Sequence, residues 1–203
     1  MILLNKNELE KNINPAIPDL KKYWELLLTW QKSVNLISPK TIENGWERHI
    51  LDSAQLYFLI SNQQDSLMDV GSGGGLPGIV MAILNKALKG PLKKIVLVES
   101  DMKKALFLKE CVRQLRLDVD VQRERVENIS FIPDVITARA FAPLNDLLKL
   151  VQKNVSRETI LLLPKGKNVD EEIKMLDEKY KIEKLKNIIN SDGCILKIEK
   201  GEL

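Results

Sequence analysis

The segment Ser66–Gly78 holds the residues whose types and spacing could do chemistry. It reads Ser-Leu-Met-Asp-Val-Gly-Ser-Gly-Gly-Gly-Leu-Pro-Gly, an apolar strand pattern followed by a glycine turn and a new helix start. Glycines at 71, 73 and 75 permit positive φ and let the backbone approach a ligand closely. Such a turn after a strand is typical of ligand sites in open α/β sheets.

The glycine spacing alone does not identify the ligand. Gly73, Gly75 and Gly78 form a G-x-G-x-x-G pattern, which by itself is a weak signal for a dinucleotide site. A phosphate-binding loop is excluded, because Ile79 and Val80 stand where lysine and a hydroxyl residue are needed. A glycine-rich surface loop without a ligand is disfavoured by the strand and helix signals on either side of it.

Two carboxylates bear on the ligand, and one of them favours a nucleoside without phosphates. Asp69 lies two positions before Gly71, where it would repel a pyrophosphate and attract an ammonium group. S-adenosylmethionine (SAM) has that ammonium group and no phosphate, so we predict SAM in preference to a nicotinamide dinucleotide. Glu99 ends an apolar run about 20 residues further on, where α/β folds place a carboxylate on ribose hydroxyl groups. Glu99 supports an adenosine ligand of either kind.

The composition indicates one globular domain. The chain has 203 residues, of which 44% are hydrophobic and 29% charged. No apolar run is long enough to span a bilayer, and the N-terminus lacks a secretory pattern. Cys111 and Cys194 are far apart and His49 is the single histidine, so we predict no metal site and a cytoplasmic location. Nothing in the sequence demands more than a monomer, so a monomer is expected. The net charge of +3 permits a polyanionic partner without requiring one.

Alternating strand and helix patterns predict a doubly wound sheet behind the glycine turn. Apolar spacing predicts helices over Pro18–Ser33 and Trp46–Ile60, which would form an N-terminal helical cap (residues 1–62) before the α/β core (residues 63–203) of a single domain. Strands are expected at Ser66–Val70, Ile95–Glu99, Asp118–Gln122, Asp134–Ala138, Thr159–Leu163, Lys181–Ile188 and Cys194–Glu199. Further helices are expected at Pro77–Leu88, Met102–Leu115 and Leu144–Val151, with a charged amphipathic segment at Val169–Glu178. The short turn at 190–193 makes the last two strands antiparallel, so the sheet has seven mostly parallel strands.

Five motifs in the same order resemble the RsmG family, also called glucose-inhibited division protein B. They are the glycine turn, Trp30–Leu36, Arg48–Ser53, Thr137–Ala142 and Leu163–Gly166, and together they cover nearly the whole chain. The resemblance implies a Rossmann-like class I SAM-dependent methyltransferase fold. It also implies N7 methylation of one guanine in 16S rRNA, guanine 527 in the usual bacterial numbering, with the small ribosomal subunit or its precursor as partner.

The resemblance also assigns contacts to the cofactor. Carried over by position, SAM contacts fall on Gly71, Leu76, Val126, Glu127 and Arg139. Asp69, Gly73 and Glu99 are assigned to the SAM site because of their residue types and positions, as argued above. The predicted SAM site is therefore Asp69, Gly71, Gly73, Leu76, Glu99, Val126, Glu127 and Arg139, with Arg139 and Phe141 as positioning residues and no certain catalytic residue.

The residue types favour a reaction that needs no acid, base or nucleophile. Methylation of pyrimidine C5 needs a thiolate, yet Cys111 and Cys194 fit packed positions. The Asn/Asp-Pro-Pro-aromatic loop of exocyclic amine methylation is absent, and Thr137–Phe141 stands in its place. Guanine N7 already has a lone pair and carries no proton, so positioning can supply much of the catalysis.

Several roles stay open at this point. We expect Phe141 either to stack on the target base or to fill the core, and Arg139 to pair with a carboxylate such as Glu127 or with RNA phosphate. His49 and Asp52 lie three apart on one helix face, where we expect them to hold the cap against the glycine turn rather than to form a hydrolase site.

Three other functions remain as alternatives. They are a nicotinamide-dependent oxidoreductase, a methyltransferase with another substrate, and an RNA-binding assembly factor with a vestigial SAM fold. Lys165 follows the fifth strand at the ligand edge, where it would contact either RNA phosphate or solvent.

Overall fold

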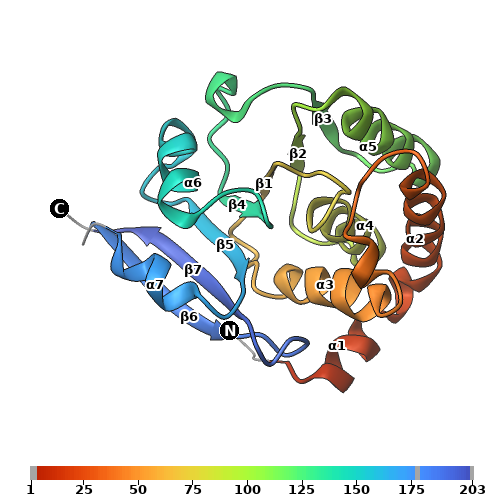
Figure 1. The fold of residues 1–203 in the computed structure, drawn as a ribbon, viewed down its shortest axis with the longest axis horizontal. Coiled ribbons are helices and arrows are strands. Elements are labelled where there is room, and N and C mark those ends of the chain that lie inside the picture. Colours follow the sequence, from red (N-terminus) through yellow and green to blue (C-terminus); the bar gives the residue numbers. More distant parts are fainter. Residues whose placement is uncertain (1–3, 177–178, 202–203) are drawn as a thin grey trace.

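The computed structural model describes residues 4–176 and 179–201, and this part of the chain forms a seven-stranded sheet flanked by helices (Figure 1). The strand order is β3-β2-β1-β4-β5-β7-β6. The first five strands are parallel, and β7 is antiparallel to both of its neighbours. The predicted fold class, a doubly wound and mostly parallel α/β sheet, is confirmed.

The strands lie close to the ranges that their apolar runs predict. They are β1 (Ser66–Val70), β2 (Lys94–Val98), β3 (Asp120–Gln122), β4 (Val135–Ala138), β5 (Ile160–Lys165), β6 (Tyr180–Lys186) and β7 (Cys194–Lys200). Glu99 therefore directly follows β2 instead of ending it. The antiparallel pairing of the last two strands is confirmed.

The helices include one that the apolar pattern did not reveal. They are α1 (Lys6–Asn12), α2 (Ile17–Gln31), α3 (Asp52–Tyr57), α4 (Gly78–Leu88), α5 (Met102–Leu115), α6 (Leu144–Leu150) and α7 (Val169–Lys174). The unexpected α1 begins with a capping box, in which the Asn5 side chain accepts from the Glu8 amide and the Glu8 carboxylate accepts from the Asn5 amide. In the described part of the chain, no helix is long and apolar enough to cross a membrane.

Two predicted helical segments differ from the structure. The expected helix over Trp46–Ile60 is a π-helical segment, η3 (Trp46–Leu51), followed by α3. The expected segment Val169–Glu178 begins as α7, but residues 177 and 178 lie outside the described residues. The remaining short helices are the 3-10 segments η1 (Asn14–Ala16), η2 (Pro39–Thr41), η4 (Val126–Asn128) and η5 (Gln152–Asn154).

Successive residues of the buried strands divide between the two faces of the sheet. In β1, Leu67 belongs to an apolar cluster with α3, α4 and α5, whereas Met68 and Val70 belong to a second cluster with α6. Helix α2 packs outside α4 and α5 (Figure 1). Its residues Leu20 and Leu27 share the first cluster, so the N-terminal helices form an outer layer over the α/β core.

The carboxyl ends of β1 and β4 meet where the strand order reverses. Strand β2 lies on one side of β1 and β4 on the other, so the connections leave this point in opposite directions. Open α/β sheets bind ligands in the crevice at such a point. Because Val70 pairs with Ala138, the glycine turn after β1 and Arg139 after β4 lie side by side.

Candidate functional site

The glycine turn has the backbone that its sequence predicts. Gly71, Gly73 and Gly75 have φ values of 65°, 53° and 84°. A Cβ added at Gly71 would overlap the ring of Phe141. At Gly73 the nearest atom to such a Cβ would be the Gly71 carbonyl oxygen, 3.7 Å away. The turn therefore presents open space at Gly73, which a ligand can approach closely.

The turn is anchored from two sides. The amides of Gly71 and Ser72 donate to the Val98 carbonyl at 2.9 and 3.1 Å. The buried Tyr23 hydroxyl, from α2, donates to the Gly74 carbonyl. Strand β2 and the N-terminal helices thus fix the turn in place.

Asp69 lies beneath the turn with no exposed surface. One carboxylate oxygen accepts from the Thr137 hydroxyl at 2.8 Å, and the other accepts from the Gly78 amide at 3.2 Å, at the start of α4. Burial raises the pKa of the Asp69 carboxyl from 3.8 to about 6, against the hydrogen bonds from Thr137, Ser72 and Gly78. Asp69 therefore holds the start of α4, and its direct contact with a ligand stays a prediction.

Glu99 and the segment after β3 occupy the same edge of the sheet. The Glu99 carboxylate accepts from the Gly73 amide at 2.9 Å and from the Asp101 amide at 2.8 Å, so it abuts the turn where we expect the ribose. In η4, Val126 is buried and Glu127 is exposed. Leu76 is buried within the turn itself. The structure brings these predicted residues to one edge, and their contacts with SAM stay predictions.

A cleft of about 1020 Å³ opens beside the turn, at the carboxyl ends of β4 and β5. It is lined by side chains from the segment 44–52, the loop after β4, the segment 164–175 and the connection between β6 and β7. Its polar and aromatic lining includes Arg139, Phe141, Lys165, Glu172, Asn187 and Asn190. The ligand edge therefore has two halves, a glycine turn over β1 and β2 and a wider cleft over β4 and β5.

The loop after β4 separates these two halves. Ala140 has a φ of 49°, a conformation that is strained for a residue with a Cβ. Phe141 is 40% exposed and lies against Gly71, so the alternative of a core aromatic is wrong. Strained backbone held in one place is typical of functional loops.

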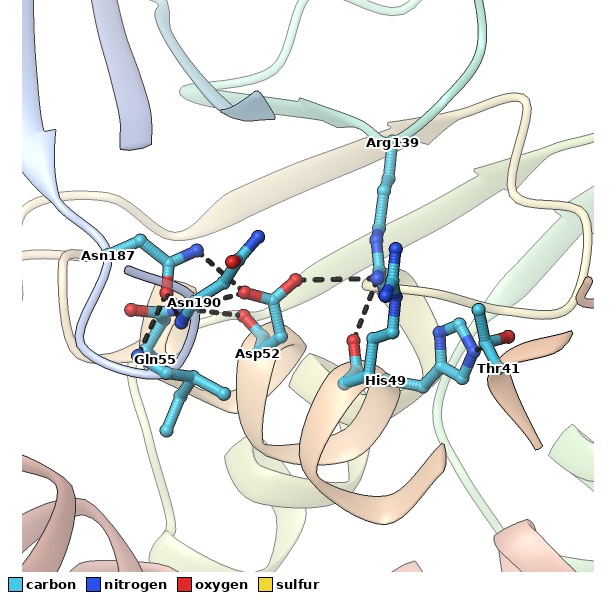
Figure 2. Close-up of polar contacts among 9 residues, drawn as sticks. Thr41, His49, Asp52, Gln55, Arg139, Asn187 and Asn190 are labelled. Carbon is cyan, nitrogen blue, oxygen red and sulfur yellow. Dashed lines mark hydrogen bonds and ion pairs between the residues drawn. The ribbon is translucent and has the colours of Figure 1, made fainter. Parts of the chain in front are cut away.

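Arg139 pairs with a carboxylate as expected, but the partner is different. Its Nη2 lies 3.4 Å from an oxygen of Asp52 and donates to the Arg48 carbonyl at 2.8 Å (Figure 2). Burial lowers the pKa of Arg139, and the Asp52 charge opposes this. The prediction of Glu127 as the partner is wrong, because the Arg139 side chain faces Asp52 in the N-terminal helices and not the segment after β3.

Asp52 joins three segments that are distant in the sequence. One of its carboxylate oxygens accepts from the side-chain amides of Asn187 and Gln55 at 2.7 and 3.0 Å, while the other faces Arg139 (Figure 2). The network links α3, the loop after β4 and the connection after β6. Asp52 thus holds the N-terminal helices against the cleft.

His49 has its own set of contacts. Its Nε2 lies 2.7 Å from the Thr41 hydroxyl (Figure 2), and its ring stacks on Trp24 with centroids 6.3 Å apart. Burial, together with the charges of Arg139 and Arg48, lowers the pKa of His49 to about 4. His49 is therefore neutral near pH 7, and the idea that it acts as a pair with Asp52 is wrong. The expected link between the N-terminal helices and the glycine turn is made instead by Tyr23.

Lys165 is neither solvated nor free. Its Nζ lies 2.7 Å from a Glu172 carboxylate oxygen, and its side chain is 13% exposed. The same Glu172 oxygen accepts from the Leu144 amide at 2.8 Å, at the start of α6. The pair closes the far wall of the cleft, and a contact with RNA stays a prediction.

Neither cysteine is placed to act as a nucleophile. Cys111 and Cys194 are both buried, and burial raises the pKa of each thiol. Within residues 4–176 and 179–201, no three His, Cys, Asp or Glu side chains come together as a metal site would require.

The roles of three residues of the site had no signal in the sequence. Thr137 opens one of the family motifs but reads there as one more residue of a buried strand, Tyr23 reads as part of an apolar helix face, and Asn187 reads as part of a polar turn. Only the fold places the Thr137 hydroxyl on Asp69, the Tyr23 hydroxyl on the glycine turn and the Asn187 amide on Asp52.

The strand order and the glycine turn define the architecture of class I SAM-dependent methyltransferases. A similar solved structure is the SAH-bound Podospora anserina methyltransferase PaMTH1, with 14% identity, a TM-score of 0.63 and coverage of 100% of this chain and 99% of that chain. Another is a putative O-methyltransferase from Klebsiella pneumoniae, with 17% identity, a TM-score of 0.65 and coverage of 97% and 96%. At these identities the likeness concerns the fold alone.

Sequence similarity then gives the family. Residues 16–192 match the family described as rRNA small subunit methyltransferase G, or GidB. Ribosomal RNA small subunit methyltransferase G of Jannaschia sp. (strain CCS1) is 38% identical over 187 residues, which cover 91% of this chain and 88% of the relative. The protein of the same name from Bartonella henselae is 42% identical over 190 residues, covering 91% and 87%. The chain belongs to the rRNA small subunit methyltransferase G family, and the predicted resemblance is confirmed.

Proposed function

We propose that the protein uses SAM to methylate N7 of one guanine in 16S rRNA, guanine 527 in the usual bacterial numbering. The observation that carries this proposal is the pairing of an open glycine turn with a cleft directly across the β1–β4 edge. One half of the edge suits a methyl donor, and the other half suits a base.

The residues at the turn fit SAM. Gly73 leaves open space where a side chain would block a ligand, and Glu99 sits against the turn where a ribose is expected. The Nη1 of Arg139 is buried and has no hydrogen-bond partner among the described residues, so it can donate to the carboxylate of the methionine end. SAM, when bound, supplies an electrophilic methyl group.

The charges near the turn disfavour a dinucleotide. Asp69 lies behind the turn and Glu99 beside it. The Asp69 carboxylate opposes a diphosphate and favours the ammonium group of the methionine end, whereas Glu99 fits the ribose of either ligand. The alternative of a nicotinamide-dependent oxidoreductase is weaker for this reason.

The cleft suits a reaction in which the protein only positions its substrate. Phe141 is exposed at the junction between the cleft and the turn, where its ring can stack on a base. Guanine N7 attacks with its own lone pair, so no side chain has to remove a proton. Orientation of two reacting groups is worth up to about 7–11 kcal/mol in favourable cases.

The product of this reaction is a cationic base. An aromatic ring face stabilises a cation that lies over it, which gives Phe141 a second use. Because Cys111 and Cys194 are buried with raised thiol pKa values, methylation of a pyrimidine at C5 is disfavoured. The RNA substrate is taken from the names of the relatives, and a monomeric, cytoplasmic protein stays a prediction.

The proposal is tested by methyl transfer to ribosomal particles. Purified protein is incubated with methyl-tritiated SAM and small subunits, or free 16S rRNA, from a strain that lacks this methylation. We expect label in the RNA, inhibition by S-adenosylhomocysteine (SAH) and no effect of NADH. Tight NADH binding without label in the RNA would favour the oxidoreductase, and RNA binding without label would favour an assembly factor.

A further inference from the structure

The ion pair between Arg139 and Asp52 lies next to the place where the methyl donor is expected. Arg139 directly follows Ala138, which pairs with Val70, so Arg139 and Gly71 leave neighbouring strands side by side. Adjacent strands lie about 4.8 Å apart. A charge on Arg139 is therefore felt at the glycine turn.

This position presents an electrostatic conflict. SAM carries a positive sulfonium, and a guanidinium stays protonated in proteins. The Arg139 side chain is only 18% exposed, so water screens its charge weakly. An uncompensated Arg139 would repel the sulfonium of the cofactor that the site is proposed to bind.

We propose that Asp52 is a positioning residue that makes the site selective for a cationic methyl donor by neutralising Arg139. The inference rests on the proposed function, because it assumes that SAM binds at the glycine turn. It assigns Asp52 a role in discriminating SAM from its neutral product SAH.

The contacts of Asp52 suit this role. Its side chain is 9% exposed, and one carboxylate oxygen is fixed by the amides of Asn187 and Gln55. The other oxygen therefore faces Arg139, as Figure 2 shows. The Arg48 carbonyl accepts from the same guanidinium nitrogen and directs it toward Asp52. Arg139 is thus held toward the N-terminal helices.

SAM and SAH form a matched pair of probes for this charge. They share the ammonium group, carboxylate, ribose and adenine, and they differ by one methyl group and the sulfonium charge. A tenfold change in affinity corresponds to about 1.4 kcal/mol, and any two unit charges interact this strongly at about 12 Å when the effective dielectric constant is about 20. The ratio of the two dissociation constants therefore reports the charge around the sulfur.

The test is calorimetric titration of each variant with SAM and with SAH. For Asp52→Asn, we expect SAM affinity to fall about tenfold more than SAH affinity. For Arg139→Gln, the ratio of the two dissociation constants should change in the opposite direction, so that SAM is favoured over SAH more than in the wild type. The double variant should return toward the wild-type ratio, because both charges are gone. Asp65→Asn is the matched control. Asp65 immediately precedes β1, at the end of the strands opposite to the glycine turn, and its carboxylate pairs with Lys93. The ratio of the SAM and SAH dissociation constants should not change in this variant.

The outcomes separate an electrostatic role from a structural one. Equal losses of SAM and SAH affinity in Asp52→Asn would overturn the inference, because misplacement of the site weakens both ligands alike. If that variant does not fold, Arg139→Gln decides alone, and an unchanged ratio overturns the inference. A wild-type protein that binds neither ligand would contradict the proposed function and the inference together.

Discussion

Replacing Asp69 by asparagine should stabilise the protein near pH 7 while weakening its cofactor site. Asp69 is fully buried, and burial raises the pKa of its carboxyl from 3.8 to about 6. In Asp69→Asn, the amide oxygen can accept from the Gly78 amide and the amide nitrogen can donate to the Thr137 hydroxyl. The substitution therefore removes the charge with little change in packing.

The sign of the pH dependence follows from the raised pKa. The folded protein binds the Asp69 proton more tightly than the unfolded chain, so this stabilisation is complete below pH 3.8 and is lost as the pH rises through about 6. The full loss is about 3 kcal/mol, of which about 2 kcal/mol falls between pH 4.5 and 7.5. Asp69→Asn does not ionise and avoids this loss.

The assay is urea unfolding at pH 4.5, 6 and 7.5, followed by tryptophan fluorescence. We expect the stability of Asp69→Asn relative to wild type to rise by about 2 kcal/mol across this range. Asp134→Asn is the matched control, since the Asp134 carboxylate accepts from the amides of Asp65 and Ser66 at the start of β1. Burial raises the pKa of Asp134, but hydrogen bonds from Ser66 and Asp65 outweigh it and hold the pKa below its usual value, so its difference from wild type should stay flat.

A flat difference for Asp69→Asn over the same range would refute the reasoning, because it would mean that the buried carboxyl titrates like a solvated one. The same variant should bind SAM more weakly, since the charge that favours the ammonium group is lost. Stronger SAM binding by Asp69→Asn would contradict the electrostatic part of the account.

Substitutions at three further positions test the loops around the site. Gly73→Ala, at a φ of 53°, should lower the free energy of unfolding by about 1–2 kcal/mol, measured by thermal unfolding. Because the new methyl group would occupy space open to the ligand, calorimetry should show a loss of SAM binding free energy larger than this loss of stability. Ala140→Gly should raise thermal stability by about 1 kcal/mol, because it relieves left-handed strain at a φ of 49°. Phe141→Ala should raise the KM for the small subunit about tenfold with little change in Tm, since stacking is worth about 1–3 kcal/mol per base, whereas Phe141→Tyr should not.

Each of these has a clear contrary result. Normal SAM binding by Gly73→Ala would remove the turn from the cofactor site. A lower Tm for Ala140→Gly would mean that the loop is not strained. An unchanged KM for Phe141→Ala would mean that the ring packs on Gly71 and does not stack on the RNA base.

The glycine turn was predictable from the sequence because its signals are local. Positive φ at Gly71, Gly73 and Gly75 follows from residue type, and the placement of Glu99 follows from strand length. Hydrophobic periodicity gave the strands and most helices within a few residues. Family motifs added Arg139, whose role cannot be read from composition or spacing.

The side-chain network around Asp52 was not predictable, because it depends on tertiary packing. Asn187 and Asp52 are 135 positions apart, and no local pattern relates them. The π-helical segment before Asp52 also changes which side chains share a face, so helical spacing wrongly paired His49 with Asp52. The orientation of Asp69 depends on Thr137 in a neighbouring strand and on the position of α4.

Chemical mapping of the methylated base tests the central claim most directly. Small subunits from a strain lacking this methylation are treated with the protein and SAM, and their 16S rRNA is reduced with borohydride and cleaved with aniline, which breaks the chain at N7-methylguanine. We predict a single new break at guanine 527 that SAH suppresses. Methyl incorporation without that break, or a break elsewhere, would contradict it.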